Sequence, residues 1–176
     1  ATILSQRTRD ETSSRAADRL FSIYNSPTSL AEADKETIQE VIRPVGFYKV
    51  KASRIKEVSR IILEKFNGNV PSNLEDLLSL PSVGRKTANC VLVYGFGKPA
   101  IPVDTHVHRV FNRLGVVNTK TPDETELDLK NIISQELWSD LNEYVIRFGK
   151  TICKPIGPRC RVCTLNNSCK TYSKRI

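Results

Sequence analysis

The fold of this chain is decided by residues 80–89, Leu80-Pro81-Ser82-Val83-Gly84-Arg85-Lys86-Thr87-Ala88-Asn89. Leucines at helical spacing and the capping pair Ser72 and Glu75 predict a helix before this stretch, and Pro81 ends it. Apolar residues at the same spacing predict a second helix that begins near Arg85. A glycine turn before a helix offers unpaired backbone N–H groups and the positive end of the helix dipole, which suits a phosphate. The pattern also fits a plain turn between two helices.

Composition favours a nucleic-acid partner. The 176 residues include 27 Lys and Arg against 19 Asp and Glu, which gives a net charge of +8. A basic balance favours a polyanion, although a solvated basic surface has the same composition. No apolar run approaches the ~20 residues that cross a bilayer, so we expect no membrane partner; we also expect a monomer. Methionine is absent and Ala1-Thr2-Ile3-Leu4 resembles the inside of an apolar helix, so we expect a further N-terminal segment.

Apolar residues recur at helical spacing along most of the chain, which predicts an all-α fold. Residues 121–124, Thr-Pro-Asp-Glu, combine an N-cap, a first-turn proline and a capping-box glutamate. Helix ends are predicted at Pro44-Val45-Gly46, at Asn67-Gly68 and at Gly115. The loop at residues 95–99 is the expected boundary between a domain of residues 1–98 and a domain of residues 99–176. The predicted helical faces are Ala16, Ala17, Leu20, Phe21 and Tyr24; Ile38, Val41, Ile42 and Val45; Ile55, Val58, Ile62 and Phe66; Val107, Val110, Phe111 and Leu114; and Trp138, Leu141, Val145 and Phe148.

Four of the five cysteines lie within 17 residues, as Cys153, Cys160, Cys163 and Cys169, with the spacing C-x6-C-x2-C-x5-C. Such a group predicts a metal centre in a reducing compartment, and sulfur ligation points to zinc or an iron–sulfur cluster. Zinc ribbons usually have two C-x-x-C pairs, whereas this segment has one pair and two wider gaps, which favours the bulkier cluster. A disulfide framework is the alternative. Cys90 is expected to be a small buried residue within a helix.

Residues 80–89 and the cysteine spacing resemble the helix-hairpin-helix and the [4Fe-4S] loop of the endonuclease III family of DNA glycosylases. The resemblance extends from residues 4–6 to Cys169. The family commonly has glycine where this chain has Ser82, and a positive φ there would cost serine roughly 1–2 kcal/mol. The resemblance implies a two-lobed helical DNA glycosylase fold. The first lobe would be a helical barrel with the hairpin, the second would hold a structural [4Fe-4S] cluster on the four cysteines, and the active site would lie in the cleft between the lobes.

The resemblance assigns the chemistry to Lys86 and Asp104, whose 18-residue separation matches the catalytic pair of the family. Lys86 would attack C1′ of the target nucleotide and form a Schiff base. Partial burial near the positive end of a helix dipole favours the nucleophilic neutral amine. Asp104 would stabilise positive charge on the sugar and assist proton transfer. Without the resemblance, Lys86 also fits an exposed phosphate contact, and Asp104 also fits the N-cap of the helix that begins at Thr105.

The resemblance also implies a set of DNA contacts. The loop at residues 5–10 would face DNA and insert one side chain into the gap left by the extruded base. Gln6 and Arg7 are both candidates, and ungapped alignment favours Arg7. The loop at residues 5–10 also fits a solvated connection. His106 also fits a packed side chain, and the arginines of the cysteine loop also fit ordinary surface solvation. The other expected contacts are Leu80, Pro81, Ser82, Val83, Gly84, Arg85, His106, Arg159 and Arg161.

The implied function is base-excision DNA repair. A bifunctional DNA N-glycosylase would draw an oxidised pyrimidine out of duplex DNA and cleave the resulting abasic site by β-elimination. One alternative is a mismatch or adenine glycosylase of the same fold, although such enzymes commonly lack the hairpin lysine. The other alternative is a DNA-binding module with a structural metal and no catalysis. We expect the protein to lie with the nucleoid of a prokaryotic cytoplasm, or in a eukaryotic nucleus or mitochondrion.

Overall fold

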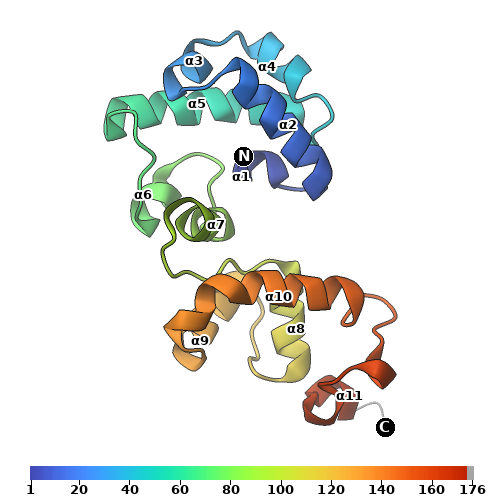
Figure 1. Cartoon of the computed structure of the whole chain (residues 1–176). Helices are drawn as coiled ribbons and strands as arrows, with labels where there is room; N and C mark the ends of the chain where they lie inside the picture. The colour runs from blue at the N-terminus through green and yellow to red at the C-terminus, as the bar shows by residue number, and fades with distance from the viewer. Residues whose placement is uncertain (174–176) are drawn as a thin grey trace. The chain divides into compact units, whose positions relative to one another are not determined.

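The structure is a computed structural model that describes residues 1–173. All regular elements in this range are helices (Figure 1), which confirms the all-α prediction. Their bounds are α1 Thr2–Ser5, α2 Asp10–Ile23, α3 Pro27–Glu32, α4 Lys35–Val41, α5 Tyr48–Phe66, α6 Leu74–Ser79, α7 Arg85–Phe96, α8 Thr105–Leu114, α9 Pro122–Ile132, α10 Trp138–Thr151 and α11 Lys170–Ser173, with 3-10 turns η1 Gln135–Leu137, η2 Cys160–Val162 and η3 Asn166–Ser168.

The chain forms two compact units that meet within α7, between Val91 and Leu92. The boundary predicted from the sequence lies a few residues later, in the loop that follows α7. The division into one domain with the hairpin and another with the cysteines remains a prediction.

The first unit is built around α5, against which α1, α3 and α4 pack (Figure 1). Its core consists of small and branched apolar residues, and Ala16, Ile38, Ile42 and Ala52 are fully buried. As predicted, α5 stops at Asn67-Gly68, where both residues have positive φ angles of 50° and 77°. These left-handed residues end the helix because they turn the chain away from the helix axis.

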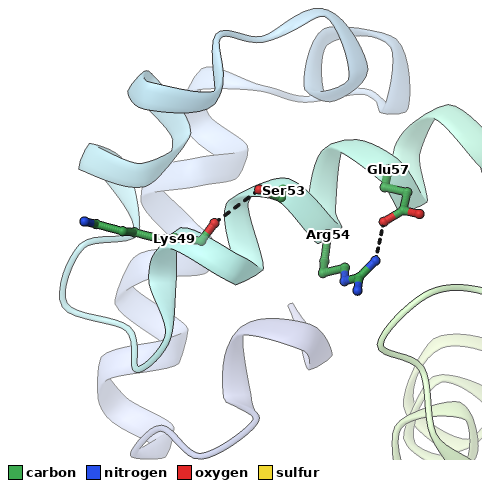
Figure 2. A network of polar contacts seen from close by, with 4 residues as sticks. All are labelled: Lys49, Ser53, Arg54 and Glu57. Atoms are coloured by element: carbon green, nitrogen blue, oxygen red, sulfur yellow. Dashed lines mark hydrogen bonds and ion pairs between the residues drawn. The ribbon is translucent and has the colours of Figure 1, made fainter.

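Two polar contacts lie along α5 (Figure 2). Ser53 Oγ donates to the carbonyl of Lys49 at 3.3 Å, and Arg54 Nη1 pairs with Glu57 Oε2 at 2.6 Å. Exposed ion pairs of this kind contribute about 0–1 kcal/mol. These exposed contacts therefore add little to the free energy that holds α5 in place.

Two local predictions in the first unit were wrong. The helix expected to run from Ile38 through Val45 ends at Val41, although Ile42 and Val45 are still buried. Pro44 has no N–H to donate, so the helical ladder cannot continue across it. The N-cap of α6 is Asn73, not Ser72, because the Asn73 side chain accepts from the amide of Asp76 at 2.9 Å.

The second unit packs α9, α10 and α11 against α8. Ile101, Val107 and Leu129 are completely buried in its core. Its two predicted helix signals are confirmed. Thr121 and Glu124 form the capping box of α9, and Gly115 ends α8 with a φ of 87°.

Candidate active site, hairpin and cysteine loop

Buried apolar residues anchor the hairpin between α6 and α7. Leu77 and Leu80 are buried, and the amide of Val83 closes the turn on the carbonyl of Leu80 at 3.2 Å. Ser82 at the tip is exposed and has a φ of 63°. This conformation favours glycine and costs a residue with a Cβ roughly 1–2 kcal/mol. The positive φ that the sequence analysis considered for Ser82 is therefore present, and serine occupies a left-handed position.

Gly84 plays a different part in the same turn. It is exposed and does not have a positive φ, and a Cβ built on it would meet no atom within 4 Å. Neither the backbone conformation nor internal packing therefore requires glycine at this position. The bare backbone leaves room for an outside group to approach the amides at the start of α7.

The loop between α1 and α2 separates the two candidates for insertion into DNA. The Gln6 amide nitrogen donates to the carbonyl of Ser82 at 2.7 Å and to the hydroxyl of Thr87 at 3.2 Å. Arg7 is exposed with a φ of 51°, and its guanidinium lies 5.8 Å from the ring centroid of Phe47. Gln6 is thus engaged with the hairpin, whereas Arg7 lies on the surface beside an exposed aromatic ring.

A buried lysine, which the sequence analysis did not identify, holds the same loop. Lys51 of α5 is only 6% exposed. Its ammonium group donates to the carbonyls of Leu4 at 2.9 Å and Gln6 at 2.5 Å and to the hydroxyl of Thr8 at 3.1 Å. Burial lowers the pKa of Lys51 below its ordinary value. A signal was available, because Lys51 shares the buried face of α5 with Ile55 and Ile62.

Lys86 lies in the first turn of α7 and is exposed. The partial burial that would favour its neutral amine is therefore not found within the described chain. The next residue, Thr87, is buried and bonded to Gln6, so the first turn of the helix is anchored directly beside the lysine.

Asp104 is the N-cap of α8, the alternative role that the sequence suggested. One carboxylate oxygen, Oδ1, accepts from the amides of His106 at 2.8 Å and Val107 at 2.9 Å. Within residues 1–173, both hydrogen bonds that the Asp104 side chain accepts use this oxygen. The partly exposed carboxylate can thus cap a helix with one oxygen and offer the other to a substrate.

The two histidines of α8 differ in their surroundings. Nδ1 of His106 lies 3.1 Å from Nη2 of Arg109, which also donates to the carbonyl of Gly149. His108 bonds to the buried hydroxyl of Thr125 at 2.7 Å. His108 therefore belongs to the packing of α8 against α9. The DNA contact of His106 remains a prediction.

The four clustered cysteines line a single cavity in the second unit. None of the five cysteines, all of which lie among residues 1–173, forms a disulfide, and Cys90 is buried in α7 as expected. Among the described residues, no group of three or more Cys, His, Asp or Glu side chains is gathered tightly enough for one metal ion. Four thiols around one cavity suit sulfur ligation, as in zinc sites and iron–sulfur clusters.

Two arginines of α8 hold the start of the cysteine loop, and the sequence analysis missed both. Arg109 donates to the carbonyl of Cys153 through Nε and Nη2 at 3.1 and 3.0 Å. Arg113 donates to the carbonyls of Lys154 and Pro155 at 2.7 and 2.9 Å, and its Nη1 lies 3.7 Å from the sulfur of Cys153. Both arginines follow an i, i+4 spacing on α8, which is the only sequence signal for their shared role.

Comparison with known proteins matches residues 1–135 to the family described as HhH-GPD superfamily base excision DNA repair protein. Endonuclease III of Thermotoga maritima is 52% identical over 175 residues, which cover 99% of this chain and 82% of that protein. Endonuclease III of Bacillus subtilis is 39% identical over 176 residues, covering 99% and 80%. A trapped covalent intermediate of endonuclease III with DNA superimposes with a TM-score of 0.92 at 38% identity, covering 98% of this chain and 82% of that one.

The chain belongs to the endonuclease III family of the HhH-GPD superfamily. It is a base-excision repair enzyme, a DNA glycosylase and abasic-site lyase. Across residues 1–173, no helix has the length and apolar character needed to span a bilayer.

Proposed function

We propose that this enzyme removes oxidised pyrimidines from duplex DNA and that Lys86 is its nucleophile. One observation supports this role above others: Lys86 is exposed on the first turn of α7. The hairpin before it is anchored by buried leucines and by the hydrogen bonds of Gln6. An exposed amine on an anchored helix end can meet the sugar of a nucleotide drawn out of the duplex.

The proposed reaction begins when Nζ of Lys86 attacks C1′. A nitrogen–carbon bond forms, the glycosidic bond breaks, and the departing base takes the electron pair and a proton. The sugar ring then opens to an imine on Lys86. Loss of a C2′ proton and of the 3′ phosphate cleaves the strand by β-elimination. Asp104 would stabilise the positive charge that develops on the sugar through the oxygen that does not cap α8.

Four cysteines would hold a [4Fe-4S] cluster: Cys153, Cys160, Cys163 and Cys169. When bound, the cluster would supply a rigid crosslink for a loop that contains no buried residue. Arg109 and Arg113 would orient the first cysteine by holding the carbonyls around it. The exposed Arg159 and Arg161 in the same loop would then be held in place to contact DNA phosphates.

The partner would be double-stranded DNA that carries damaged or abasic sites, bound by the chain as a monomer. Phosphates would lie on the hairpin amides around Gly84 and on Arg85, and Arg7 or Gln6 would fill the gap left by the extruded base. His106 would contact the damaged strand. The enzyme would act where the genome lies, with the nucleoid of a prokaryote or in a eukaryotic nucleus or mitochondrion.

The test is borohydride trapping on duplexes that each carry one defined lesion. The wild-type protein should be trapped on DNA with an oxidised pyrimidine. Lys86→Gln should lose trapping and keep most of its lesion affinity, because it retains length and polarity but cannot form an imine. Asp104→Asn should keep α8 capped and lose base excision by roughly 100-fold or more, because only the charge is removed. Trapping that persists in Lys86→Gln would move the nucleophile elsewhere.

The same assay separates the two alternatives. Base release without strand cleavage, on a mismatch or an adenine in place of an oxidised pyrimidine, would indicate a glycosylase that does not use Lys86. Lesion-independent binding without base release would indicate a non-catalytic module.

A further inference from the structure

We propose that Gln6 is a positioning residue for the lyase reaction and not the residue that fills the gap in DNA. The inference rests on the proposed role of Lys86. Gln6 spans from the loop after α1 to both sides of the lysine, through the carbonyl of Ser82 and the hydroxyl of Thr87. Its side chain therefore holds the hairpin tip and the first turn of α7 in one arrangement.

The hairpin of this chain has a particular need for such a contact. Ser82 adopts a φ of 63°, which a glycine would adopt without strain. Its side chain favours relaxation of the turn toward negative φ, and this relaxation would redirect the carbonyl and the amides that follow. A hydrogen bond of 2.7 Å to that carbonyl opposes the change. The hydrogen bond from Gln6 thus stabilises a left-handed turn that glycine would adopt without strain.

Gln6 can restrain the hairpin because its own backbone is fixed. The ammonium group of Lys51 holds the carbonyls of Leu4 and Gln6 and the hydroxyl of Thr8. The Thr8 hydroxyl also accepts from the amide of Gly46 at 3.2 Å. The Gln6 main chain is therefore tied to α5, and its side chain is tied to α7.

Gap filling would require the opposite properties. A side chain that enters the duplex must be exposed and must point away from the protein before DNA binds. Gln6 is partly buried and makes two internal hydrogen bonds, both of which it would have to break. The neighbouring Arg7 is exposed. The insertion role therefore falls to Arg7.

The sharpest variant is Gln6→Glu, which preserves size but places a carboxylate against the carbonyl of Ser82. The measurement is the single-turnover rate of imine formation, trapped with borohydride, at saturating abasic-site duplex. We expect this rate to fall by about 10- to 100-fold, because misplacement of an attacking group by about an ångström has effects of this size. The dissociation constant should change less than about threefold. Gln39→Glu on α4 introduces the same charge away from the hairpin and should leave the rate unchanged.

A second pair of variants tests the mechanism of the effect. Gln6→Ala should slow imine formation without adding a charge, and it serves as the test if Gln6→Glu does not fold. Adding Ser82→Gly should restore most of that rate, because glycine holds the left-handed turn without help. Such rescue is a coupling between two contacting residues, and a general loss of stability would not produce it.

Two results would overturn the inference. In the first, Gln6→Ala weakens affinity for abasic DNA, leaves the saturated rate unchanged and is not rescued by Ser82→Gly, so Gln6 is the gap-filling residue. In the second, both Gln6 variants keep the wild-type rate and affinity, so the contact has no role. A wild-type protein that is not trapped at all would instead refute the proposed role of Lys86, whatever Gln6 does.

Discussion

The hairpin and the cysteine loop reach a defined shape by different physical means. The hairpin has buried leucines on its inner side, a buried Thr87 at the start of α7 and two hydrogen bonds from Gln6. The loop at residues 153–169 contains no buried residue, and α8 holds its start through Arg109 and Arg113. Without apolar burial, a segment of this length gains too little to offset its conformational entropy. The hairpin can therefore be stable as protein alone, whereas we expect the loop to need the cluster proposed for its cysteines.

The largest expected effect comes from removal of a cysteine. Cys160→Ser should lose the cluster and unfold residues 153–173, because metal binding and local folding are coupled. The hairpin should keep its structure. Iron and sulfide analysis should find about four of each in a yellow-brown wild-type protein, and hydrogen exchange should show loss of protection in the loop only. A colourless anaerobic preparation with one zinc per chain would contradict the cluster assignment.

Lys51→Met should have the next largest effect on stability, and this effect should fall on the first unit, which contains the hairpin. The change leaves three oxygen acceptors without their donor at a position that is only 6% exposed. We expect the free energy of unfolding to fall by roughly 2–4 kcal/mol, measured in urea. Lys49→Met is the matched control, because Lys49 is exposed two residues away on the same helix (Figure 2). Equal effects of the two changes would show that the three contacts contribute nothing.

Gly46→Ala should have a smaller effect, by pushing on the loop that carries Gln6. A Cβ at Gly46 would lie 2.9 Å from the carbonyl oxygen of Arg7, so the backbone must shift. We expect a loss of about 1–3 kcal/mol in stability. Gly84→Ala should change stability by less than about 0.5 kcal/mol because the site is open. Its DNA affinity should nevertheless fall, since the added methyl group occupies the approach to the hairpin amides. Unchanged affinity would remove the hairpin from the DNA interface.

The smallest expected effects concern the salt dependence of DNA binding. Each phosphate contact that is lost should reduce the slope of log K against log salt by about 0.9. Arg85→Ala should test the hairpin, and Arg159→Ala and Arg161→Ala should test the cysteine loop. A slope that changes for Arg85 alone would limit the DNA interface to the hairpin and leave the loop with a purely structural role.

Structural features with a local signal could be predicted from the sequence. Most helices were predicted from apolar spacing, and the capping box at Thr121 and the stop at Gly115 were predicted from short motifs. Errors occurred where two local signals competed. Asn73 displaced Ser72 as the N-cap of α6, and the helix that Pro44-Val45-Gly46 was predicted to close ends earlier, at Val41. The roles assigned to Lys86, Asp104 and the cysteines remain predictions, although Asp104 also caps α8.

The sequence by itself determined the all-helical class, the hairpin and the cysteine group, because each depends on residue types at fixed short spacing. Only the tertiary structure decided that Lys51 binds the loop at residues 4–8 and that Gln6 restrains Ser82. These contacts join residues 45, 47 and 76 positions apart. The direction of a backbone carbonyl depends on the path of the whole chain, so no local pattern could predict which side chain would meet it.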